Sequence, residues 1–87
     1  MKENQLYIRT KTTIFNTASS EEAKEAVYSC NSILKEKGAS DQQRNNIWGT
    51  IFEEDIPVYE SEELISTEVA NGIREAIHEV ANEDGVT

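Results

Sequence analysis

The carboxylates are the side chains of this sequence best placed to form a site, because they are numerous and clustered. Between residues 53 and 63 there are six acids and no base. On the helix expected near the C-terminus, more carboxylates recur in steps of seven and four, which places them in one row. The two acidic clusters are either a patch for a basic partner or an ordinary solvated face. The candidate partner-binding acids are Glu53, Glu54, Asp55, Glu60, Glu62, Glu63, Glu68, Glu75 and Glu79.

Two aromatic residues are candidate anchors at a protein interface, Trp48 and Tyr59. Tryptophan is over-represented among the residues that dominate binding energy. The competing interpretation places Trp48 in the core, because Ile47, Ile51 and Phe52 share its face of a helix.

Catalytic chemistry has little support in the sequence. His78 is the only histidine, and nothing in its neighbourhood supplies a nucleophile or an orienting group. Cys30, the only cysteine, lies within an apolar helical stripe, which indicates a buried, inert thiol. No phosphate loop, zinc motif or calcium loop is present, and the run Glu53–Asp55 is a weak cation site. We therefore expect no enzyme, no metal and no cofactor.

The charge balance narrows the class of partner. The 87 residues hold 17 Asp+Glu against 8 Lys+Arg, a formal charge of −9. Such a chain repels nucleic acid but can imitate it on a basic protein surface. The charges are unevenly distributed, because residues 1–37 hold five acids and six bases whereas residues 38–87 hold 12 acids and two bases. We expect one small acidic domain, 1–87, with an acidic C-terminal part.

The location follows from the same composition. No signal peptide or transmembrane helix is expected, since no long apolar run is present. A lone cysteine fits a reducing compartment, so we expect a cytoplasmic protein.

The local signals predict an α+β fold that is mainly helical. Residues 5–16 are rich in Thr and Ile, which predicts an N-terminal strand. Capping boxes at Ser19 and Ser40 predict helices over 20–37, ending at Gly38, and over 41–53. Residues 56–58 read as a short edge strand because of Pro57, and Ser61 is expected to cap a long helix to residue 82.

The alternative fold is β-α-β-β-α, with residues 47–52 as a strand and both helices on one face of a three-stranded sheet. In the first fold the N-terminal strand has too few partners within one chain. Its open edge therefore predicts a homodimer formed by pairing of two copies.

Three functions follow from these observations. The leading hypothesis is a non-enzymatic regulator or inhibitor that occupies a basic, nucleic-acid-binding surface of another protein, a type common among products of phages and mobile elements. The second is a homo-oligomeric adaptor or assembly component. The third is a small-ligand binder at a chain–chain interface, using Arg74, His78 and Tyr59.

Overall fold

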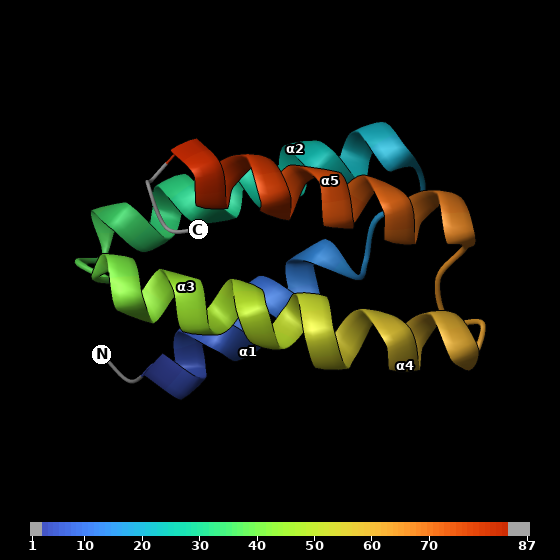
Figure 1. The fold of residues 1–87 in the computed structure, drawn as a ribbon, viewed down its shortest axis with the longest axis horizontal. Coiled ribbons are helices and arrows are strands. Elements are labelled where there is room, and N and C mark those ends of the chain that lie inside the picture. Colours follow the sequence, from blue (N-terminus) through green and yellow to red (C-terminus); the bar gives the residue numbers. More distant parts are fainter. Residues whose placement is uncertain (1–2, 84–87) are drawn as a thin grey trace.

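The computed structural model describes residues 3–83, and this part of the chain is all helical, with no strand (Figure 1). The predicted α+β fold is therefore wrong, and so is the β-α-β-β-α alternative. The elements are α1 (Glu3–Ile14), α2 (Ser20–Glu36), α3 (Asp41–Thr50), a π-helical segment η1 (Ile51–Asp55), α4 (Ile56–Ser61) and α5 (Thr67–Glu83).

Helix α1 replaces the predicted N-terminal strand. Its buried residues are Leu6, Thr10 and Ile14, which recur every four positions and so lie on one side of a helix. Thr and Ile favour strands, but here the burial of one helical face against other elements outweighs that preference. Without a strand there is no open edge, so the argument for pairing two copies through this segment no longer holds.

Helices α2 and α3 begin where the capping signals predict. Ser19 Oγ accepts a hydrogen bond from the Glu22 amide at 3.1 Å, and Ser40 with Gln43 forms a full capping box. At the other end of α2, Gly38 has φ +85° and the amide of Ala39 donates to the Leu34 carbonyl. The helix predicted over 20–37 is confirmed.

The chain from Asp41 to Ser61 forms one continuous rod, consisting of α3, η1 and α4. The helix predicted over 41–53 is thus confirmed as helix, but the edge strand at 56–58 is wrong. Pro57 lies in the first turn of α4, directly after the wider π turn. A proline lacks an amide donor, and its ring clashes with the carbonyl four residues earlier in a regular α-helix. The wider π turn before Pro57 changes the hydrogen-bond pattern at this point, so the helix continues through the proline.

Helix α5 starts at Thr67, five residues later than predicted, because the chain first makes a tight turn. Glu63 takes the left-handed conformation (φ 61°), and the amide of Leu64 donates to the Tyr59 carbonyl at 2.9 Å. These bonds end α4 in the same way that Gly38 ends α2. Ser66, rather than Ser61, then caps α5 by accepting a bond from the Val69 amide.

The helices pack as two layers, with α2 and α5 in one and α1 and the rod in the other (Figure 1). Helices α2 and α5 run in the same direction and form the most extensive contact between elements. Gly72 permits their close approach, since a Cβ there would lie 2.9 Å from the Ser20 carbonyl oxygen. The core between the layers is mainly aliphatic, with Ile14, Leu34, Ile51, Ile56 and Ile73 fully enclosed.

Candidate functional site

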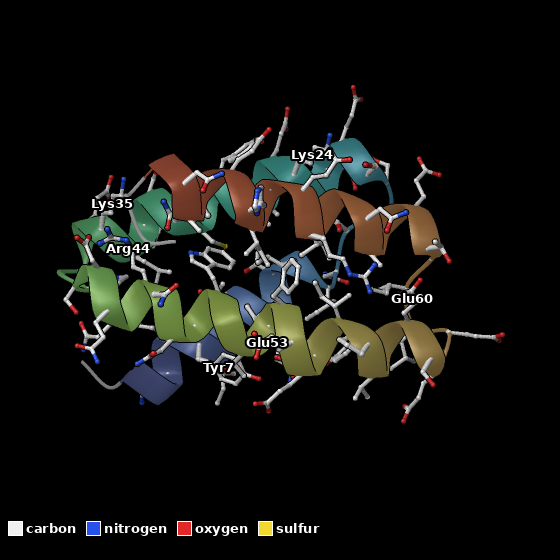
Figure 2. All side chains as sticks on the ribbon, in the orientation of Figure 1. Tyr7, Lys24, Lys35, Arg44, Glu53 and Glu60 are labelled. Carbon is white, nitrogen blue, oxygen red and sulfur yellow. The ribbon has the colours of Figure 1, made fainter. Side chains whose placement is uncertain are left out.

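Asp55, one of the candidate partner-binding acids, makes contacts within the protein. Its carboxylate accepts a hydrogen bond of 2.5 Å from the Tyr7 hydroxyl and lies 3.8 Å from Lys11 Nζ. Burial, and next the hydrogen bond to Asp55, raises the pKa of Tyr7 above its usual range. Figure 2 shows Tyr7 beside the rod. Asp55 therefore joins α1 to the rod and is not free for a partner.

Glu60 joins α4 to α5. Arg74 Nη2 donates to Glu60 Oε1 at 2.8 Å, in a half-buried position. This hydrogen bond is the main reason that the pKa of Glu60 is lowered, with a further bond from Thr67 acting in the same direction. Glu60 is thus paired and holds the rod against the final helix (Figure 2).

Glu75 and Glu79 pair with the neighbouring helix α2. Lys24 Nζ lies 2.8 Å from Glu75 Oε1, and the Tyr28 hydroxyl donates to Glu79. Both pairs follow the parallel register of α2 and α5, in which each four-residue step on one helix matches a step on the other. The predicted row of carboxylates is present, but two of its members face α2.

The other five candidate acids are exposed and have no hydrogen-bond or ion-pair partner within residues 3–83. We call these five residues the acidic surface: Glu53, Glu54, Glu62, Glu63 and Glu68.

The acidic surface has two parts. Glu53 and Glu54 lie midway along the rod, whereas Glu62 and Glu63 lie in the turn between α4 and α5 at one end of the bundle, with Glu68 at the start of α5 (Figures 1 and 2). Helix α2 begins at this same end. Its exposed Glu21 therefore adds another negative charge at the end of the bundle that holds Glu62 and Glu63. The sequence did not indicate this residue, because only the tertiary structure brings the start of α2 to this end.

The two candidate anchor residues are placed differently. Trp48 is only 3% exposed, and its indole Nε1 donates to Asn31 Oδ1 at 2.9 Å, so it packs in the core. Tyr59 is half-buried and stacks on Phe15, with ring centroids 4.1 Å apart. Among the aromatic side chains of the rod, Phe52 is the most exposed, and it lines hollows beside α5.

The residues considered for ligand binding line only open hollows. Arg74 and His78, with Phe52, border a hollow of about 470 Å³ between the rod and α5, and Tyr59 is not part of it. Cys30 is buried, and burial raises the pKa of its thiol, which makes the thiolate scarce at neutral pH. Nothing in this arrangement pairs Cys30 with His78.

Among residues 3–83, no group of three or more His, Cys, Asp or Glu side chains is arranged to hold a metal ion. No helix in this range has the length and apolar character needed to cross a membrane.

Comparisons with protein-family models, with curated proteins and with solved structures gave no match.

Proposed function

We propose that this protein is a non-enzymatic regulator or inhibitor that binds another protein through its acidic surface. The observation that carries the proposal is that the five exposed carboxylates of the acidic surface have no partner within residues 3–83. Lys11, Lys24 and Arg74 pair instead with the other candidate acids Asp55, Glu75 and Glu60. Unpaired charge of one sign attracts a surface of the opposite sign and speeds association with it.

The partner that fits this surface is a protein with a basic face, of the kind that binds nucleic acid. An array of exposed carboxylates offers such a face the charge that phosphates would offer. Binding then blocks nucleic acid by competition and requires no catalytic residue in this chain. A cytoplasmic location, where such targets occur, belongs to the same proposal.

The experiment that tests this function compares two charge-reversed variants of equal net charge. The first is Glu53→Lys with Glu54→Lys, which alters the acidic surface. The second is Glu25→Lys with Glu36→Lys, which reverses exposed acids of α2 outside it. Glu60 is left unchanged, because its reversal would break the pair with Arg74.

Each tagged protein is used to capture partners from host lysate at low and high salt, and the purified partner is then titrated against a fluorescent nucleic acid. We expect a basic protein whose affinity falls by about tenfold or more with the first variant and little with the second. We also expect the wild type to displace the nucleic acid. Equal binding of both variants, or ternary binding without displacement, would contradict the proposal.

A further inference from the structure

Two basic side chains of this acidic protein differ from the others because they form no ion pair within the described residues. Within residues 3–83, Arg9 and Lys37 are the basic side chains with no hydrogen-bond or ion-pair partner. Both line one groove, between α1 and the C-terminal half of α2. In a chain of net charge −9, two unpaired cations beside one groove form a local site for a negatively charged group.

The groove between these cations is apolar. Leu6 and Leu34 form its buried floor, and Ile33 forms a wall that is 48% exposed. Its volume of about 190 Å³ lies below the range of small-molecule pockets and suits a single aliphatic side chain. The groove therefore fits an apolar side chain that has carboxylates beside it.

The chain itself carries such a segment in the turn between α4 and α5. Leu64 is 61% exposed, more than any other large apolar side chain of the described residues. Glu62 and Glu63 precede it directly, and both are unpaired within the described residues. The hydrogen bonds that end α4 hold this turn in one conformation, so little order must be gained when it binds.

We propose that the groove of one molecule binds the Glu62–Leu64 turn of a second copy. Leu64 enters the groove, and the carboxylates of Glu62 and Glu63 face Arg9 and Lys37. The groove and the turn lie toward opposite ends of a bundle about 33 Å long, so a molecule cannot fill its own groove (Figure 1). The contact is head-to-tail, and it extends into a chain or closes into a ring.

The decisive experiment uses two variants that block opposite halves of the contact. Arg9→Glu with Lys37→Glu blocks the groove, whereas Leu64→Ser blocks the turn. All three positions are on the surface or at the groove rim, and circular dichroism checks that helical content is unchanged. Sedimentation velocity over rising protein concentration measures association.

We expect the wild type to associate as concentration rises, and each variant to associate at least about tenfold more weakly, because one buried leucine is worth roughly that factor or more. A mixture of the two variants retains one intact groove and one intact turn. It should form a heterodimer and nothing larger. Val58→Ser, which alters another exposed apolar residue on α4, should associate as the wild type does.

Disulfide trapping adds a test of position. Cys30 is buried, so the trap uses Ile33→Cys on the exposed groove wall together with Glu62→Cys. This variant keeps Leu64 and should place two exposed thiols of neighbouring copies side by side. With oxidised glutathione as the electron acceptor, we expect a ladder of linked species on a non-reducing gel. Ile33→Cys with Val58→Cys is the matched control and should give no ladder.

A wild type that stays monomeric at all concentrations would overturn the proposal. So would association that both blocking variants retain, or trapping that is equal for the two cysteine variants. The reversal of Glu53 and Glu54 leaves the groove and Leu64 intact, so it should leave this self-association unchanged. Failure of the proposed function and failure of this inference are therefore separable.

Discussion

Tyr7 and Asp55 are 48 positions apart in the sequence, yet their side chains share a hydrogen bond. Lys11 lies near the same carboxylate, with its ammonium over the rings of Tyr7 and Tyr59 at 5.5 and 5.7 Å from their centroids. At the scale of single residues, the acid-rich segment thus supplies a structural contact as well as an exposed surface.

The Tyr7 hydroxyl predicts a loss of stability at alkaline pH. Its pKa is raised in the folded state, so its contribution is fully present below the usual tyrosine value of 10.0 and is lost as pH rises through the folded value. Tyr7→Phe should lower the free energy of unfolding by about 1.5 to 3 kcal/mol at pH 7, the usual value for a hydrogen bond to a charged group. The difference from wild type should shrink above pH 10.

Urea denaturation at neutral and strongly alkaline pH measures this effect. Tyr28→Phe is the control, because Tyr28 also donates to a carboxylate but is exposed. A Tyr7→Phe penalty that stays constant up to the highest pH would show that the hydroxyl does not titrate with folding.

At the scale of elements, the parallel contact between α2 and α5 depends on one small residue. Gly72 lies in the middle of α5 and faces the start of α2, where Ser20 leaves no space for a methyl group. Gly49 in α3 also lies within a helix, but nothing is within 4 Å of the position that a Cβ would take. The same substitution should therefore have opposite effects at the two sites.

Gly72→Ala should destabilise the protein by about 1 to 3 kcal/mol, because the Ser20 backbone must move to admit the methyl group. Gly49→Ala should stabilise it by up to about 1 kcal/mol through helix propensity. Thermal unfolding measures both, with an expected shift of about 4 to 8 °C per kcal/mol for a domain of this size. Equal shifts at the two sites would contradict the close approach of α2 and α5.

At the scale of the whole molecule, several Lys and Arg side chains form ion pairs within the fold, so they do not neutralise the exposed acids. Asp55, Glu60 and Glu75 each have a basic partner, whereas the five residues of the acidic surface have none within residues 3–83. In a chain of net charge −9, these five unpaired carboxylates repel other negative charges of the folded protein.

Salt should therefore stabilise the dilute protein. Raising NaCl from about 0.02 to about 0.5 M shortens the screening length severalfold and reduces repulsion among exposed carboxylates. We expect the midpoint of thermal unfolding to rise with salt, and to rise less in the variant Glu53→Gln with Glu54→Gln. A midpoint that falls with salt would show that ion pairs such as Lys24 with Glu75 outweigh the repulsion.

The sequence by itself determined the features that depend on near neighbours. The cap at Ser19, the capping box at Ser40 and the glycine turn at Gly38 each involve residues a few positions apart, so local spacing was sufficient to predict them. The burial of Cys30 in α2 followed from the helical spacing of its apolar neighbours, although one of these neighbours, Ile33, is 48% exposed. The abundance and clustering of carboxylates were likewise evident without a structure.

Only the tertiary structure decided whether residues 5–16 form a strand or a helix, because Leu6, Thr10 and Ile14 are helical through contacts with distant elements. It also decided which acids are free. Asp55, Glu60, Glu75 and Glu79 have partners that are between 14 and 51 positions away, and no local pattern identifies them. The physical reason is the same in both cases: burial and charge pairing depend on which residues the fold brings together, not on their order in the chain.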